Sequence, residues 1–421
     1  MKRLPQPTAV CATVLVTASA VFAGVEPLSG SWRAWLECPG GELPFGLDLR
    51  REGDGWQAWI VNGEERIAIP RATVAEGRVV LDVDYYDSKI EANVGGDGSR
   101  LDGKWTKRAA GGGWTSMAFH ATAGESWRFG RVDGVGALTA APTPSIAPRW
   151  AVRFSKSDDL AVGLFSSQPT GLAAGTFLTA TGDYRYLAGD FDGRRLRLSC
   201  FDGAHAFLFD ARMQSDDTLA GDFWSRDSWH ETWTAKPDAS ASLPDAFHMT
   251  RWSGNARLGD LTFPDLDGKP RSLNDPAFVG GARIIVVFGS WCPNCHDETA
   301  YLVELHHKYR DRGLRVVGLA FELTGDLARD TKQVRTYAER NGLTYPVLIA
   351  GVSDKDQASL AVPILDRVRA YPTTIFADAS GTIRAVHTGF SGPATGAEHK
   401  KLRAAFERLI GEMLSGSADQ P

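Results

Sequence analysis

The segment that ends in Cys295 constrains the fold of this chain more than any other part of its sequence. An apolar run at residues 284–288 leads into Trp291-Cys292-Pro293-Asn294-Cys295, so two cysteines stand where a buried strand would meet a helix. At a helix N-terminus, unpaired backbone N–H groups and the helix dipole stabilise an anion, so the first thiol is expected to ionise readily. Cys295 follows one helical turn later, close enough to form a disulfide with it. The pattern therefore predicts thiol–disulfide exchange.

The cysteine pair has two other interpretations. With His296 the motif also reads Cys-x-x-Cys-His, the attachment sequence of c-type haem. We favour the redox dithiol, because alternating strand and helix patterns surround the motif and the nearest downstream methionine is Met413. A zinc site would need a second cysteine or histidine pair at ligand spacing. We therefore expect no metal and no cofactor, and we interpret His296 as a solvated helix residue.

The region from about 258 to 414 resembles the TlpA/ResA type of thioredoxin domain. The sequence at 263–270, Phe-Pro-Asp-Leu-Asp-Gly-Lys-Pro, resembles the N-terminal hairpin of that family. Glu298 is the acidic residue three positions after the second cysteine, and Tyr371-Pro372-Thr373-Thr374 matches the segment that holds a cis-proline opposite the dithiol. The strand and helix patterns between residues 314 and 413 independently predict a mixed α/β sheet with helices on both faces.

The resemblance implies a set of site residues. The expected catalytic residues are the nucleophile Cys292, the resolving Cys295, the proton acceptor Glu298 and the groove-shaping cis-proline Pro372. The expected substrate groove consists of Trp291, Pro293, Asn294, Tyr371 and Thr373. Glu298 could instead only complement the helix dipole. We favour the proton acceptor, because the buried aspartate of thioredoxin is replaced here by Val286.

The region before the thioredoxin-like segment contains an internal repeat. The sequence 101–105, Leu-Asp-Gly-Lys-Trp, recurs at 219–224 as Leu-Ala-Gly-Asp-Phe-Trp, a spacing of about 118 residues. Each copy has short alternating runs separated by turns such as Asn62-Gly63, which is typical of antiparallel β-barrels or sandwiches. The sequence thus predicts two repeated β modules followed by an α/β domain. The tryptophans of these modules are interpreted as core residues, and no catalytic group is expected there.

The ends and the composition suggest an exported protein. Lys2 and Arg3, followed by an apolar run, are typical of a signal peptide at residues 1–23. No other stretch is apolar enough to span a membrane, and the net charge of −5 argues against nucleic acid and anionic membranes as partners. The location is expected to be periplasmic or otherwise extracytoplasmic. The predicted divisions are a first module (24–130), a linker (131–148), a second module (149–236), a linker (237–256), the thioredoxin-like domain (257–415) and a tail (416–421).

These observations predict an exported oxidoreductase that reduces protein disulfides. The resemblance implies protein clients and a membrane thiol donor that keeps the dithiol reduced. The direction stays open, because Pro293 after the first cysteine is shared with oxidising relatives such as DsbA. A thiol peroxidase of the peroxiredoxin branch is one alternative, although Gly289 and Ile285 stand where that branch has Thr or Ser and Pro. The other is a ligand-binding β protein with an accessory thioredoxin domain.

Cys38 and Cys200 could form a bridge, but buried free thiols are the simpler interpretation.

Overall fold

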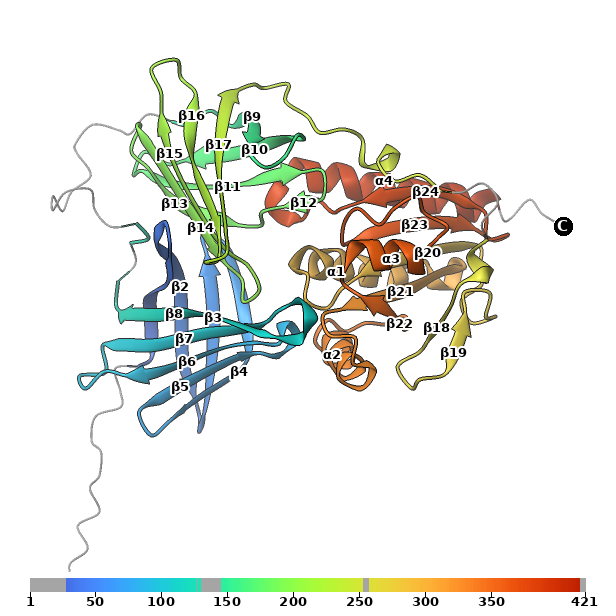
Figure 1. Ribbon diagram of the computed structural model, residues 1–421, viewed down its shortest axis with the longest axis horizontal. Coiled ribbons are helices and arrows are strands. Elements are labelled where there is room, and N and C mark those ends of the chain that lie inside the picture. The colour runs from blue at the N-terminus through green and yellow to red at the C-terminus, as the bar shows by residue number, and fades with distance from the viewer. Residues whose placement is uncertain (1–27, 126, 130–144, 253–256, 417–421) are drawn as a thin grey trace, which may run out of the picture.

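Two antiparallel barrels and one α/β domain follow one another in the computed structural model (Figure 1). The structure describes residues 28–125, 127–129, 145–252 and 257–416. The predicted signal peptide, most of the first linker and nearly all of the tail lie outside the described residues. The predicted domain boundaries stay predictions.

The first barrel is closed because β1 pairs with both β2 and β8. Buried and exposed residues alternate along its strands, as expected when one face of a sheet fills an interior. Trp32 and Trp105 are fully buried, and the indole N–H of Trp105 donates to the Ser88 hydroxyl at 2.7 Å. Its strands are β1 (Gly30–Cys38), β2 (Gly41–Glu52), β3 (Gly55–Asn62), β4 (Glu65–Ala75), β5 (Arg78–Val83), β6 (Ser88–Val94), β7 (Arg100–Arg108) and β8 (Trp114–Ala123).

The second barrel closes where β10 pairs with both β9 and β11, and the short strand β12 is added beside β11. Its interior is filled by stacked rings: the Phe209 centroid lies 4.5 Å from that of Phe177 and 4.3 Å from that of Phe223. The prediction of two antiparallel β modules is therefore confirmed as two barrels. Its strands are β9 (Arg149–Phe154), β10 (Leu160–Ser167), β11 (Leu172–Thr179), β12 (Gly182–Asp183), β13 (Leu187–Phe191), β14 (Arg195–Phe201), β15 (Ala206–Met213), β16 (Leu219–Ser225) and β17 (Trp229–Pro237).

The C-terminal domain has a five-stranded sheet in the order β22-β21-β20-β23-β24, and a two-stranded hairpin precedes it. The first three of these strands run parallel, and β23 and β24 are antiparallel to their neighbours. The strands are β18 (Thr262–Pro264), β19 (Pro270–Ser272), β20 (Ala282–Phe288), β21 (Leu314–Glu322), β22 (Val347–Val352), β23 (Thr373–Asp378) and β24 (Ile383–Thr388). The α-helices are α1 (Pro293–Tyr309), α2 (Leu327–Arg340), α3 (Lys355–Ala361) and α4 (Ala397–Gly416).

Single turns of 3₁₀ helix occur in the connections. They are η1 (Asp84–Tyr86), η2 (Ala110–Gly112), η4 (Ala246–His248), η5 (Leu258–Asp260), η6 (Arg310–Arg312) and η7 (Pro393–Thr395).

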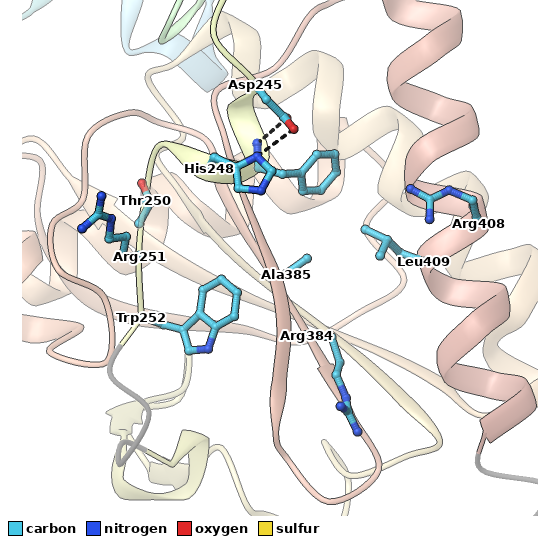
Figure 2. A pocket seen from close by; sticks show the side chains of 10 residues that line it. Asp245, His248, Thr250, Arg251, Trp252, Arg384, Ala385, Arg408 and Leu409 are labelled. Atoms are coloured by element: carbon cyan, nitrogen blue, oxygen red, sulfur yellow. Dashed lines mark hydrogen bonds and ion pairs between the residues drawn. The ribbon is translucent and has the colours of Figure 1, made fainter.

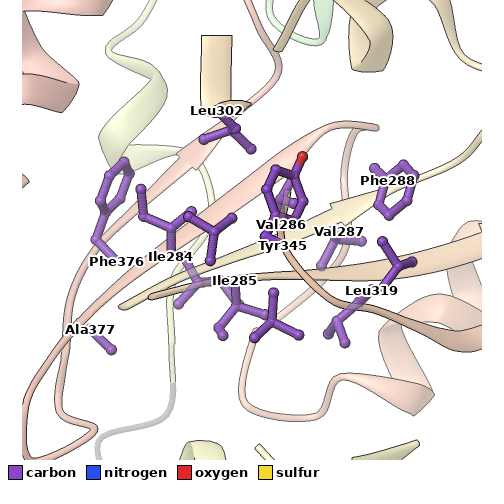
Figure 3. Close-up of a cluster of buried hydrophobic side chains, with 14 of the residues drawn as sticks. Ile284, Ile285, Val286, Val287, Phe288, Leu302, Leu319, Tyr345, Phe376 and Ala377 are labelled. Atoms are coloured by element: carbon purple, nitrogen blue, oxygen red, sulfur yellow. The ribbon is translucent and has the colours of Figure 1, made fainter. Parts of the chain in front are cut away.

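The core of the C-terminal domain is built around β20. All seven residues of this central strand are buried, which explains why its sequence is a continuous apolar run. Its successive side chains point to opposite faces, and Leu302 of α1 packs on the same face as Ile284 (Figure 3). The sheet therefore fixes the point at which β20 ends and the cysteine motif begins.

Candidate active site

The dithiol lies where the chain passes from β20 into α1. Cys292 is the N-cap residue of α1, and its Sγ accepts a hydrogen bond from the backbone N–H of Cys295 at 3.3 Å. Such a contact satisfies one of the free N–H groups of a helix start and favours negative charge on the sulfur. Both thiols are free; Cys292 is 7% exposed and Cys295 is 1% exposed. The first cysteine is therefore the more accessible of the two.

The predicted proline segment lies opposite the first cysteine. The Tyr371–Pro372 peptide bond is cis, as predicted, and the Cys292 thiol donates to the carbonyl of Tyr371 at 3.4 Å. The Trp291 ring packs edge-on against the Tyr371 ring with centroids 5.4 Å apart, and its N–H donates to the Phe321 carbonyl at 2.9 Å. These contacts hold the turn that carries the dithiol against the proline segment.

Glu298 is fully buried on α1 beside the second cysteine. Its Oε1 accepts a hydrogen bond from the Thr374 hydroxyl, and its Oε2 has no hydrogen-bond partner among the described residues. Burial raises the pKa of Glu298 to about 8, although the bond from Thr374 opposes the shift. Burial, contact with Cys292 and the charge of Glu298 together raise the pKa of the Cys295 thiol well above its usual value. A buried thiol and a carboxylate with a spare oxygen therefore lie in the same apolar surroundings.

A second buried carboxylate anchors the turn before the cysteines. Glu322, at the end of β21, accepts hydrogen bonds from the backbone N–H of Ser290 at 2.9 Å and from its hydroxyl at 2.7 Å. Burial raises the pKa of Glu322 to about 7, and the two bonds from Ser290 oppose that shift. The carbonyl of Ser290 in turn accepts a bond from His296 Nε2 at 3.0 Å. Glu322 and His296 therefore fix the same residue from two sides.

The prediction that His296 is a solvated residue is wrong. The first barrel covers it: the ring centroids of Tyr85 and Tyr86 lie 5.0 Å and 4.6 Å from that of His296. Burial lowers the pKa of His296 to about 4. The same barrel contacts α2, where Arg340 forms an ion pair with Asp84 at 2.8 Å. Figure 1 shows one end of the first barrel lying beside α2.

The second barrel covers the two residues between the cysteines. The side-chain amide of Asn294 donates to the carbonyl of Asp183 at 3.3 Å, and Arg185 donates to the carbonyl of Pro293 at 3.3 Å. Thr373, also predicted to line the groove, is fully buried and donates to the carbonyl of Ala370 at 2.8 Å. Pro293, Asn294 and Thr373 therefore do not line an open groove, because neighbouring segments cover them.

The other two described cysteines are not part of the site. Cys38 and Cys200 are buried free thiols, so the structure contains no bridge between them. Burial raises the pKa of Cys38 to about 11 and that of Cys200 well above its usual value. Both are therefore poor nucleophiles.

Three residues of the site were missed from the sequence. Thr374 is part of the Pro-Thr-Thr signal and could have been paired with Glu298. Glu322 ends an apolar strand, which gave a weak signal of a buried acid. Arg185 gave none, because it lies 108 residues from Pro293 along the chain.

A cavity of about 620 Å³ lies away from the dithiol (Figure 2). Figure 2 shows His248 beside Asp245 at one end and Arg384 and Arg408 projecting from β24 and α4. None of the predicted site residues lines this cavity.

Comparison with known proteins identifies the C-terminal domain. The AhpC/TSA family profile matches residues 255–386. The thioredoxin-like protein YneN of Bacillus subtilis is 30% identical over 131 residues, which are 31% of this chain and 68% of that protein. The chain belongs to the thioredoxin-like family. The thiol–disulfide oxidoreductase ResA of Geobacillus thermodenitrificans is 28% identical over 130 residues, 31% of this chain and 66% of that protein.

The thioredoxin-like domain is thus of the TlpA/ResA type, and its enzyme class is thiol–disulfide oxidoreductase. A solved thiol:disulfide interchange protein from Chlorobium tepidum is 26% identical, with a TM-score of 0.29, and the match covers 39% of this chain and 97% of that one. The chain spans about two thirds of the length of the curated relatives, and these matches cover less than a third of its own length.

Proposed function

We propose that this protein is an exported oxidoreductase that reduces protein disulfides through the Cys292–Cys295 dithiol. The observation that carries the proposal is the position of Cys292, which caps α1 directly opposite the cis Tyr371–Pro372 bond. A thiolate there has the support of backbone N–H groups at the start of α1.

The proposed reaction proceeds in two exchanges. The Cys292 thiolate attacks one sulfur of the client disulfide, forms a mixed disulfide and releases the other client sulfur as a thiolate. Cys295 then loses its proton to Glu298 and attacks the Cys292 sulfur, which frees the second client thiolate. Two electrons pass to the client and the protein is left as the Cys292–Cys295 disulfide. Pro372 shapes the client site, and Trp291 and Tyr371 border it.

The cellular setting is part of the proposal. Residues 1–23 would direct export, the clients would be proteins with disulfides, and a membrane thiol donor would restore the dithiol. No helix in the part of the chain that the structure describes is long and apolar enough to cross a membrane. We also propose that the two barrels are repeats of one module and that the predicted divisions bound them.

A second candidate function is thiol peroxidase, which the AhpC/TSA match favours. Gly289 and Ile285 offer no hydroxyl or proline at the positions that the peroxiredoxin branch uses.

Ligand binding inside the second barrel is disfavoured, because packed rings such as Phe177 and Phe209 fill its interior.

A redox titration of the full chain tests the proposed direction. A reductase should have a potential nearer to about −270 mV, as in thioredoxin, than to about −120 mV, as in DsbA. The same protein should reduce insulin with dithiothreitol as the electron source. A potential near the DsbA value would reverse the direction, and faster turnover of hydrogen peroxide than of insulin would favour the peroxidase.

A further inference from the structure

The second barrel reaches the redox motif through the short strand β12. The carbonyl of Asp183 accepts the bond from Asn294 described above, and Asn294 also donates to the Phe390 carbonyl at 3.5 Å. A Cβ added to Gly182 would lie 2.4 Å from the Asn294 amide nitrogen, so a side chain there would displace it. Gly182 is therefore required for this close approach.

The backbone conformation after β12 directs the side chain of Arg185 toward α1. Arg185 has φ of 57°, a left-handed conformation that residues other than glycine rarely adopt. Its N–H donates to Asp183 Oδ1 at 2.7 Å, and Asp183 Oδ2 accepts a bond from the Gly392 N–H. Such conformations persist only where surrounding contacts hold them, and they gather at functional sites. Here they keep the side chain of Arg185 buried instead of in solvent.

The guanidinium of Arg185 joins all three parts of the protein. Nη2 donates to Glu65 of the first barrel at 2.7 Å, and Nε lies 3.5 Å from Asp202 of the second barrel. Nη1 donates to the Pro293 carbonyl at 3.3 Å and also pairs with Asp297 of α1. One positive charge is therefore fixed beside the residues that separate the two cysteines.

The charges of Arg185 and Asp297 have opposite electrostatic effects on the cysteine pair. A cation at the first turn of a helix adds to the helix dipole and favours a thiolate, whereas a carboxylate there opposes it. Burial raises the pKa of Asp297 to about 7, and Arg185 opposes that shift. Arg185 and Asp297 therefore form a compensated pair, in which the second barrel supplies the cation and α1 supplies the carboxylate.

We propose that Arg185 is a positioning residue through which the second barrel sets the reduction potential of the Cys292–Cys295 couple. The inference rests on the proposed oxidoreductase function. Reduction of the Cys292–Cys295 disulfide takes two electrons and two protons from a reduced dithiol, which itself becomes a disulfide. The charge of Arg185 is fixed beside Pro293, where it stabilises negative charge at the motif, and only the reduced dithiol can carry such charge. Arg185 thus favours the reduced side of this equilibrium and makes the potential less negative.

The test is a titration of the full chain against mixtures of reduced and oxidised dithiothreitol at pH 7. Arg185→Met should lower the equilibrium constant for reduction at least tenfold, a shift of about 30 mV toward more negative potential. Asp297→Asn, which leaves Arg185 less compensated, should shift it in the other direction. Arg195→Met is the matched control, because Arg195 pairs with Asp210 on the same barrel, and it should leave the potential unchanged.

Each outcome decides between the alternatives. Unchanged potentials in both Arg185→Met and Asp297→Asn, in protein that still reduces insulin, would overturn the role of Arg185 and leave the proposed function intact. If Arg185→Met does not fold, the near-isosteric Asp297→Asn and the charge-keeping Arg185→Lys decide. Arg185→Lys should then have a reduction potential close to that of the wild type, whereas Asp297→Asn should have a less negative one. An unchanged potential in Asp297→Asn would overturn the inference. Failure of the wild-type chain to reduce insulin would refute the proposed function itself.

Discussion

The hydroxyl of Thr374 donates to the carboxylate of Glu298, although one residue lies on β23 and the other on α1. Thr374 also stands directly opposite Val286 in the sheet register. The carboxylate of Glu298, which α1 supplies, therefore lies near the strand position of Val286. A group positioned in this way can take a proton only when it is ionised.

We therefore expect Glu298→Gln to slow disulfide reduction about a hundredfold, the scale of general base catalysis. The wild-type rate should rise as pH passes through about 8, because the ionised form of Glu298 accepts the proton. The variant should lose that rise. Insulin reduction measured from pH 6 to pH 9.5 gives both quantities, and an unchanged pH profile in the variant would show that Glu298 only stabilises the fold.

Thr374→Val offers a finer test of the same group. The substitution keeps the shape of the side chain but removes the bond that opposes the raised pKa of Glu298. The pKa of Glu298 should then rise further, so the activity midpoint should move to higher pH. The rate at high pH should be close to that of the wild type. A midpoint that moves to lower pH would contradict this account.

The raised pKa of Glu298 also makes stability depend on pH. Burial raises it from 4.5 to about 8, so the folded state holds a proton that the unfolded chain has already lost between these values. The contribution is complete below about pH 4.5 and is lost as pH rises to about 8. The wild type should therefore lose a few kcal/mol relative to Glu298→Gln over this window, as measured by urea unfolding. A difference between the two proteins that stays constant with pH would refute the linkage.

The two cysteines should behave differently when a client is trapped. Cys295→Ser removes the resolving thiol, so mixed disulfides on Cys292 should accumulate. Cys292→Ser leaves only the more buried thiol with the raised pKa and should trap little. Non-reducing electrophoresis of the full-length variants from an exported fraction checks this. Equal trapping by both would reverse the assignment of roles.

The C-terminal domain alone should be more stable when its leading segment is kept. Phe247 of η4 packs against His387 with centroids 4.7 Å apart, and Thr250 bonds to the Thr388 hydroxyl at 2.7 Å. A chain that begins at Asp245 should therefore be more stable than one that begins at Leu258, by roughly 2 kcal/mol for the lost apolar burial. Thermal unfolding of the two chains measures the difference. Equal melting temperatures would show that η4 adds nothing.

Local patterns were enough to predict the strand, the dithiol and the cis-proline. The run at 284–288, the Cys-x-x-Cys pair and Pro372 each carry their signal within a few residues. Glu298 followed from its position one turn after Cys295. These elements depend on hydrogen bonding and periodicity along one segment, which a single sequence records.

Contacts between distant segments could not be predicted in the same way. The surroundings of His296 depend on Tyr85 and Tyr86, which belong to the first barrel and lie far from it in the sequence. Whether a β module closes into a barrel depends on which strands meet at its ends, and alternation within a strand does not record that. The approach of Arg185 to Pro293 is a further contact of this kind.

The burial of Arg185 also sets an order of assembly. Glu65, Asp202 and Arg185 itself all precede Asp297 in the sequence, and domains generally fold as units with the N-terminal ones first. Both barrels can therefore assemble three of the four charges before the redox helix has folded. The last partner arrives with the helix that carries the cysteines, so alignment of the dithiol is completed only on a finished polypeptide.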